Sequence, residues 1–376
     1  MTLHLRGMAW SHPRGYDPMI ETTHTYEARN PGVRISWDKR SLQDFELYPL
    51  EQLAEDYDLI VIDHPHVGGV AREGYLVALD ELDSDGALET LAAQSIGTSH
   101  ESYQLRGHQW ALAIDAAAQV SAYRPESLVE VPTRWSEVIE VAKEGRTLWP
   151  LTPVHALSSF FTLAANLGTP CAESHHQLIA REDGYAVLEA MSAVSQHVPR
   201  ECLTMDPIEV LDRMSTGDSF VYSPLIYGYS NYARNGFGEH LIKFANIPSL
   251  GSSGPHGSTI GGTGIAVSAK SRATNEAASY AFWVASADCQ KGLYFKAGGQ
   301  PANMEAWNDT AVNNASHDFF HNTVETLQRA WLRPRYSGYL GFQEEGGEIV
   351  NAFLAGRADV ENTLRRLEEA YQRSLQ

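Results

Sequence analysis

Apolar positions along the first part of this chain alternate between strand-like runs and helical spacing. Strands are predicted over Leu3–Trp10, Val33–Trp37, 58–63 and 75–80, and helices over 17–30 and 49–56. The run 58–63, DLIVID, is wholly apolar between two acids, which is typical of a buried parallel strand. The Asp17-Pro18 pair indicates where the first helix begins. This β-α-β-α-β order predicts an α/β fold with an open sheet.

The rest of the chain continues to mix the two patterns. Further strands are predicted over 110–114, 147–150, 219–222, 242–248 and 265–268, and helices over 158–167, 185–196, 207–214, 275–287 and 360–375. Asp115 is expected to end the strand over 110–114. Gly168 is expected to end the helix over 158–167. A further helix follows Pro132, with Thr133 or Ser136 as its N-cap.

Polar and aromatic residues follow the first and third predicted strands. The two loops carry Trp10, Ser11 and His12 after the first strand, and Asp63, His64 and His66 after the third. Ligands of open α/β sheets gather beyond the carboxyl ends of the strands. We therefore expect both loops to lie at the same edge of the sheet and to form part of a ligand site.

Length and composition limit the classes of protein that fit. A chain of 376 residues is longer than one core usually serves, which predicts two domains. The net charge of −19 argues against binding to nucleic acid or to an anionic membrane surface. No apolar run approaches the ~20 residues of a membrane span. Met1 is followed at once by the first strand, so either a leader was removed or the protein stays in the cytoplasm.

The three cysteines, Cys171, Cys202 and Cys289, are widely spaced and form no metal-binding pattern. A disulfide between the first two is one alternative, and two unrelated buried thiols are the favoured one.

The stretch Phe220–Tyr232, FVYSPLIYGYSNY, concentrates tyrosines among small polar residues. Aromatic rings beside hydroxyl and amide groups suit a solute with an apolar face and several hydrogen-bonding groups, such as a sugar. Tyr222 and Tyr227 are the candidate contacts. The competing interpretation is that these tyrosines pack in the core and hold their hydroxyls in water.

Other patterns do not indicate catalysis. Asp63, His64 and His66 form an HxH-like group, but a tight loop explains them as well as zinc does, so no metal and no other cofactor is expected. The glycine-rich stretch 251–264 runs into a strand rather than a helix, which favours a crossover or hinge over a phosphate site. Asp115 has no second catalytic group beside it and is expected to accept hydrogen bonds. We predict no enzyme activity.

Five segments together resemble the family 1 extracellular solute-binding proteins of ABC importers, the maltose-binding-like group. They are DLIVIDHPHVGGVAREGYLVALD at 58–80, YQLRGHQWALAID at 103–115, PTRWSE at 132–137, GGTGIAVS at 261–268 and QPA at 300–302. Their order and spacing, across nearly the whole chain, carry the resemblance. One departure is the loop 63–66, which lacks the Asp-Arg pair of maltose binders.

The resemblance implies a type II periplasmic-binding-protein-like α/β fold, in which two lobes joined by crossover hinges close on a ligand in the cleft between them. It implies an N-terminal lobe of 1–114 plus 263–306 and a C-terminal lobe of 115–262 plus 307–376.

The resemblance also implies site residues. Tyr227-Gly228-Tyr229-Ser230-Asn231 is similar to the family's Trp-x-Trp-Ser-Asn, whose first aromatic stacks on the sugar, which gives Tyr227 that role. His155, Tyr336 and the crossover residues Gly262 and Thr263 fall near the family's cleft contacts.

The predicted function is solute binding, without catalysis, for an ABC importer. The expected ligand is a small polar solute, a sugar or sugar derivative, and the expected partner is the transporter permease. A monomer in the periplasm is implied, although the absent leader leaves the cytoplasm open. The alternatives are a binder of a quaternary ammonium or other small cation through an aromatic cage, with Asp63 or Asp115 as counter-charge, and a cytoplasmic sensor or enzyme on the same scaffold.

Overall fold

The computed structural model describes residues 2–41, 50–83, 85–217 and 219–376, which fall into two compact units. Unit 1 consists of Met1–Ala117, Gly261–Val312 and Arg335–Ser337, and unit 2 of Ala118–Ile260, Asn313–Pro334 and Gly338–Gln376. The predicted boundaries after 114, 262 and 306 fall close to three of these crossings. The return of 335–337 to unit 1 was not predicted.

Unit 1 is built on a mixed sheet whose strands follow the order β2-β1-β3-β9-β6. β1 (Leu3–Trp10) pairs in parallel with β2 (Val33–Arg40) on one side and with β3 (Leu59–Ile62) on the other. β9 (Ile260–Val267) runs antiparallel to β3, with Ile62 opposite Gly264. The prediction of a buried strand parallel to the first is confirmed for β3, whose four residues are all buried.

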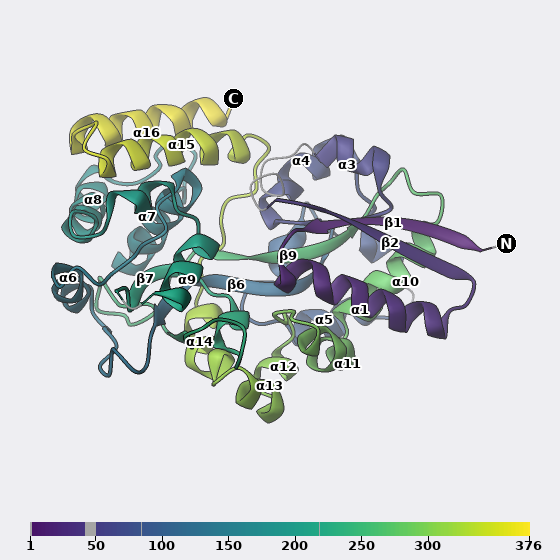
Figure 1. The fold of residues 1–376 in the computed structure, drawn as a ribbon. Coiled ribbons are helices and arrows are strands. Elements are labelled where there is room, and N and C mark those ends of the chain that lie inside the picture. Colours follow the sequence, from purple (N-terminus) through teal and green to yellow (C-terminus); the bar gives the residue numbers. More distant parts are fainter. Residues whose placement is uncertain (1, 42–49, 84, 218) are drawn as a thin grey trace. The chain divides into compact units, whose positions relative to one another are not determined.

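Helices pack against this sheet and close the core of unit 1. Figure 1 shows α1 (Pro13–Arg29) alongside β1 and β2, with which it is in contact. The remaining helices of unit 1 are α3 (Leu50–Asp56), α4 (Val67–Glu73), α5 (Ala87–Ala93), α10 (Thr274–Ala285), α11 (Ala287–Cys289) and α12 (Met304–Trp307), and α13 (Thr310–Ala315) spans the boundary. Short elements are β4 (Gln104–Leu105), β5 (His108–Gln109), the 3₁₀ turns His64–His66, Leu79–Glu81 and Glu101–Tyr103, and a π turn at Gln290–Tyr294.

Unit 2 combines a small antiparallel sheet with longer helices. The second half of β6 (Leu112–Tyr123) pairs with β7 (Tyr222–Tyr227) and with β8 (Lys243–Ala245). The helices are α6 (Trp135–Lys143), α7 (Pro153–Leu167), α8 (Arg181–Ser195), α9 (Pro207–Thr216), α14 (Phe319–Gln328), α15 (Tyr339–Leu354) and α16 (Val360–Ser374), with 3₁₀ turns at Arg200–Thr204 and Ser230–Ala233.

α7 is the central helix of unit 2. It is buried from His155 to Asn166, and the buried residues include the polar side chains of Ser158, Ser159, Thr162 and Asn166. α7 contacts α8 and α15, and α15 in turn packs on α16, which Figure 1 shows side by side in yellow. Gly168 ends α7 with a φ of 100°, a left-handed conformation that glycine adopts readily, so the predicted C-terminus is confirmed.

The structure corrects the predicted start of the first helix. α1 begins at Pro13, not at Asp17, and Pro18 lies inside it. His12 is the N-cap, because its Nδ1 accepts a hydrogen bond from the backbone N–H of Arg14. Histidine is not among the preferred capping residues, so the sequence pattern pointed to the later proline instead.

Several strand limits were also predicted wrongly. Asp115 does not end a strand, since β6 continues through it to Tyr123, and β7 begins at Tyr222 where the predicted strand ended. β9 begins at Ile260, inside the glycine-rich stretch. Segments 75–80 and 147–150 form only isolated bridges, Leu76 with Ser268 and Thr147 with Tyr222. These limits depend on cross-strand partners, which periodicity along the chain does not reveal.

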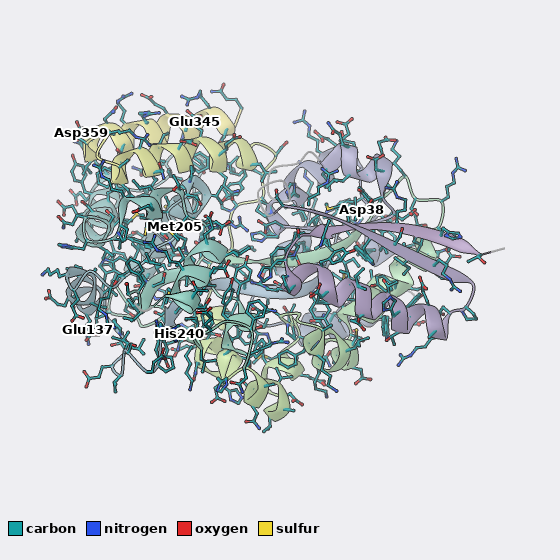
Figure 2. All side chains as sticks on the ribbon, viewed as in Figure 1. Asp38, Glu137, Met205, His240, Glu345 and Asp359 are labelled. Carbon is teal, nitrogen blue, oxygen red and sulfur yellow. The ribbon has the colours of Figure 1, made fainter. Side chains whose placement is uncertain are left out.

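The N-cap of α6 is Arg134 rather than Thr133 or Ser136. The Glu137 carboxylate, labelled in Figure 2, accepts the backbone N–H groups of Thr133 and Arg134 at 2.8 and 3.1 Å. Glu137 thus satisfies the backbone N–H groups of the N-cap residue and of the residue before it, which is the role of the acid in a capping box.

All three cysteines are buried and free, so the disulfide alternative for Cys171 and Cys202 is wrong and the buried-thiol interpretation is confirmed. Within the described ranges, no helix has the length and hydropathy needed to cross a membrane.

Candidate functional site

The carboxyl ends of β1 and β3 lie at one edge of the sheet of unit 1. β2 and β3 flank β1 on opposite sides, so the order of strand addition reverses there. Open α/β sheets bind ligands beyond the strand ends at such a switch point. The loops Trp10–His12 and Asp63–His66 follow these two strands, so the prediction that both loops share an edge is confirmed.

Trp10 and His12 form a stacked pair in the first loop. Their ring centroids are 5.4 Å apart, with the planes at 11°. Both side chains are buried, whereas that of Ser11 is exposed. Burial, followed by the positive charge of Arg14, lowers the pKa of His12 to about 3. A neutral imidazole whose Nδ1 accepts a hydrogen bond carries its proton on Nε2. His12 is therefore held as a donor at Nε2.

Arg14 lies beside this pair and binds Asp115. Its Nε donates to Asp115 Oδ2 at 2.7 Å, and its Nη2 donates to Oδ1. The two side chains are only 3% and 2% exposed. The guanidinium carbon also lies 5.8 Å from the ring centroid of Trp10, within cation–π range. Burial raises the pKa of Asp115, and Arg14 offsets part of that rise. Both carboxylate oxygens of Asp115 thus accept from the protein itself.

The second loop is a tight turn. Asp63 Oδ1 accepts the backbone N–H of His64 at 2.8 Å and lies 3.2 Å from His64 Nδ1. His64 and His66 are buried, and the three residues His64–His66 form a 3₁₀ turn. Nowhere in the described part of the chain do three or more His, Cys, Asp or Glu side chains form a group that could hold a metal ion. The geometry of this loop is that of an Asp-capped turn.

Gly262 and Thr263 lie on β9 next to these loops. β9 is antiparallel to β3, with Gly264 opposite Ile62. Thr263, one residue before Gly264, therefore lies at the edge of the sheet where Asp63 follows β3. Thr263 is buried. Gly262 has a φ of 98°, and a Cβ there would meet the carbonyl oxygen of Asp115 and lie 2.9 Å from Ala116 Cα. β9 therefore approaches β6 closely at Asp115.

The segment Arg335–Ser337 brings Tyr336 to the same unit. Arg335 Nη1 donates to the carbonyls of Glu101 and Gln104, both at 2.7 Å. The carbonyl oxygens of Arg335 and Tyr336 lie against Gly68, at the start of α4, where a Cβ would be 2.8 Å from Tyr336 O. Tyr336 is half-buried. Gly68, two residues after the second loop, thus lies directly against this returning segment.

In unit 2 the two candidate tyrosines lie at opposite ends of β7. Tyr222 is fully buried, and its hydroxyl lies 3.4 Å from Ser121 Oγ. Burial raises its pKa. Tyr227 is only partly buried and packs edge-on against His155, with ring centroids 5.8 Å apart. The structure therefore brings Tyr227 and His155 together and places Tyr222 in the core.

His155 lies in the first turn of α7, close to a buried arginine. It is 4% exposed, and burial together with the charge of Arg333 lowers its pKa to about 3. Arg333 Nη1 donates to Gln343 Oε1 at 2.9 Å, and both of these side chains are buried. At neutral pH His155 is uncharged and Arg333 is the cation beside it.

The sequence analysis singled out neither Arg14 nor Arg333, although the structure buries both side chains. The one available signal for Arg14 is its position directly after the first loop. Burial of an arginine depends on partners far along the chain, here Asp115 and Gln343, and a single sequence does not reveal them.

A pocket of about 510 Å³ lies elsewhere in unit 2. Its lining, none of which was predicted as site, consists of Tyr123, 131–134, 244–247, Ser249, Gly251, Ser252, Gly254, Pro255, Asn322 and Glu325. Asn246 Oδ1 accepts from Thr326, and Thr133 donates to Glu137. Two of its polar groups are therefore already paired within unit 2.

Several solved structures share the fold of this chain at low sequence identity. The sequence matches no protein-family model and no curated protein. The structure matches maltose-bound MalE3 of T. maritima with a TM-score of 0.83 and 17% identity over 99% of both chains. It matches an ABC transporter solute-binding protein of Thermotoga lettingae bound with alpha-D-tagatose with a TM-score of 0.84 and 15% identity over 100% of both chains. It also matches one from Agrobacterium radiobacter K84 in complex with ribitol, with a TM-score of 0.80 and 18% identity over 99% of this chain and 98% of that one.

The chain therefore has the α/β fold of ABC transporter solute-binding proteins, over its whole length and theirs. The fold class predicted from the sequence is confirmed.

Proposed function

We propose that this protein is the solute-binding component of an ABC importer and binds a sugar or polyol without catalysis. The observation that carries this proposal is the full-length likeness to solved structures whose ligands are maltose, tagatose and ribitol. At 15–18% identity that likeness concerns the fold, so the ligand class rests on the site residues as well.

Within unit 2, the proposed contacts with the solute are Tyr227 and His155. The unit 1 contacts are Trp10, Ser11, His12, Asp63, His66, Thr263 and Tyr336. Tyr227 offers a ring edge and a hydroxyl, and His12 offers a fixed donor at Nε2, which together suit a solute with hydroxyl groups. His64, Tyr222 and Gly262 act through packing, since they are fully buried or lack a side chain.

The Arg14–Asp115 pair favours a sugar over a cation. A quaternary ammonium needs an aromatic cage and a counter-charge. Both oxygens of Asp115 accept from Arg14, and the ring of Trp10 already has a guanidinium within cation–π range. Asp115 is therefore not the counter-charge that the cation alternative requires.

The two units would act as the lobes of a hinged binding protein, with β6 and β9 among the segments that connect them. Ligand would favour the closed arrangement through contacts made only there. The proposal includes a permease as partner, a monomeric state and a location outside the cytoplasmic membrane.

A thermal-shift screen tests the proposal. Maltose, D-tagatose, ribitol and glycine betaine are added singly to the purified chain, and binding is confirmed by calorimetry. A ligand at 100 times its Kd stabilises the folded state by about 2.7 kcal/mol. We expect at least one sugar or polyol to raise the Tm and betaine to leave it unchanged. For that ligand, Tyr227→Ala should weaken binding more than tenfold. A Tm raised by betaine alone, or unchanged affinity in the variant, would contradict the proposal.

A further inference from the structure

The N-terminus of α7 has backbone donors that the protein leaves unused. In this fifteen-residue helix, the first intrahelical bond is that from Ala156 N–H to Thr152 O. The backbone N–H groups of Val154 and His155 have no acceptor among the described residues. The side chain of Thr152, the N-cap residue, accepts no hydrogen bond from them, and the first turn contains no acid. Helix N-termini of this kind carry a partial positive charge and attract anions.

A buried side-chain atom in the same turn independently indicates a ligand. His155 Nδ1 is fully buried and has no hydrogen-bond partner in the described part of the chain. Leaving such an atom unsatisfied destabilises the folded state, and buried polar atoms in folded proteins nearly always have a partner. Beside the half-buried ring of Tyr227, an atom of this kind is explained by a ligand that supplies the partner.

The guanidinium of Arg333 is close enough to His155 for its positive charge, after burial, to help lower the pKa of that histidine. A neutral imidazole with Nδ1–H can donate to an anion without adding a second cation beside Arg333. The first turn of α7 thus offers two backbone donors, one imidazole donor and a nearby positive charge.

We propose that the His155 site, defined as the first turn of α7 with His155, Tyr227 and Arg333, binds a carboxylate group of the solute. The solute is then a sugar acid, an aldonate or uronate, rather than a neutral sugar. This inference rests on the proposed function and narrows its ligand class.

A carboxylate matches the site better than a hydroxyl does. A carboxylate only accepts hydrogen bonds, whereas a hydroxyl must also donate one. The backbone groups at the site are all donors, and charge-assisted hydrogen bonds to an anion are about twice as strong as neutral ones. The remaining hydroxyls of the sugar acid would be left for Tyr227 and the contacts of unit 1.

Matched ligand pairs separate this inference from the proposed function. Calorimetry compares D-glucuronate with D-glucose, D-galacturonate with D-galactose, and D-gluconate with D-sorbitol, all at pH 7.5. We expect an acid to bind at least tenfold more tightly than its neutral counterpart, with an affinity that falls as salt rises. If neutral members bind as tightly as the acids, the inference is overturned and the proposed function stands. If no member of any pair binds, the inference is overturned, and the separate screen with maltose, D-tagatose and ribitol decides the proposed function.

Two variants test whether the preference for the acid arises at the His155 site. His155→Phe retains an aromatic ring but removes Nδ1, which has no protein partner to lose, so the variant should fold with a similar Tm. We expect its acid-to-neutral affinity ratio to fall at least fivefold. Arg333→Gln should lower the same ratio, and circular dichroism checks that it folds. The control is His176→Phe, at an exposed histidine, with an unchanged ratio. An unchanged ratio in folded His155→Phe would contradict the assignment.

Discussion

Arg14 and Asp115 form a buried ion pair between residues 101 positions apart in the chain. Arg14 lies in the first turn of α1, and Asp115 lies in β6 shortly before that strand enters unit 2. Two hydrogen bonds with Gln300 hold the same part of β6. Ala116 N–H donates to Gln300 O, and the side-chain Nε2 of Gln300 donates to Ala116 O. The pair thus joins the switch-point loop to the strand that leads out of unit 1.

Breaking this pair should destabilise the protein strongly. Arg14→Met would leave the Asp115 carboxylate buried without its partner, and loss of one member of a buried pair costs about 3–5 kcal/mol. Urea unfolding measures the loss. The double variant Arg14→Met with Asp115→Asn should lose less than the sum of the two single variants, because the unpaired charge is gone. Arg6→Met, which breaks an exposed pair with Asp38, is the control and should change little. Equal losses in Arg14→Met and Arg6→Met would contradict the assignment.

The buried histidines predict a loss of stability in acid. The folded state holds the pKa of His12 and of His155 at about 3, below the value of about 6.5 expected on unfolding. The unfolded chain therefore binds more protons between these values. The stability each histidine contributes is present above pH 6.5 and is lost as the pH falls toward 3. Each contributes a slope of about 1.4 kcal/mol per pH unit.

Denaturant unfolding from pH 7 to pH 4 checks this effect. The wild-type curve should fall more steeply toward acid than that of His155→Phe, which lacks one of the two titrating groups. The exposed-site variant His176→Phe should follow the wild type. Parallel curves for wild type and His155→Phe would show that His155 is not held neutral.

Adjacent glycines in α4 should respond in opposite ways to the same substitution. Gly68→Ala would place a Cβ against the backbone carbonyls of Arg335 and Tyr336, whereas a Cβ at Gly69 meets nothing within 4 Å. We expect Gly68→Ala to destabilise the protein by about 1–3 kcal/mol, the usual range for overpacking. Gly69→Ala should be neutral or stabilising by up to about 1 kcal/mol, since alanine favours the helix. Hydrogen exchange of 335–337 should increase only in Gly68→Ala.

Gly262→Ala tests the close approach of β9 to β6. The residue has a φ of 98°, and its Cβ would meet the carbonyl oxygen of Asp115. Gly107 has a φ of 83° but open space around it, so it shares the backbone strain without the clash. We expect Gly107→Ala to cost about 1–2 kcal/mol and Gly262→Ala clearly more. Thermal unfolding measures the loss of stability in both variants. Equal losses would indicate that backbone strain, and not the contact with Asp115, causes the destabilisation.

The three thiols should be inert in the native protein. Burial raises the pKa of Cys202 to about 11 and that of Cys289 to about 12, and it raises the pKa of Cys171 as well. Only the thiolate reacts with disulfide reagents. Ellman's reagent at pH 8 should therefore label no cysteine until denaturant is added and then label three. Rapid labelling of the native protein would contradict the buried positions.

The pattern of apolar residues along the chain predicted many of the helices and strands. Leu3–Trp10 matches β1 because strand alternation and a polar turn after Trp10 are both local. The end of α7 at Gly168 was predictable for the same reason, since a left-handed residue at a helix end is a local requirement. The predicted division into two lobes was inferred from the order of the family motifs along the chain.

The features that this pattern did not predict depend on contacts between residues distant in sequence. His12 as the cap of α1, the passage of β6 through Asp115 and the start of β9 among glycines all depend on neighbours far along the chain. The same holds for the Arg14–Asp115 pair and for the burial of Tyr222 in the core.

By itself the sequence determined the order of helices and strands, the loops that follow β1 and β3, and the candidate aromatic stretch. Periodicity and turn chemistry act within a few residues, so a single sequence displays them. Only the tertiary structure decided that His155 joins Tyr227 and Arg333 while Asp115 is occupied by Arg14. Burial and ionic pairing depend on contacts across the folded chain, and a residue's type and position in the sequence do not determine them.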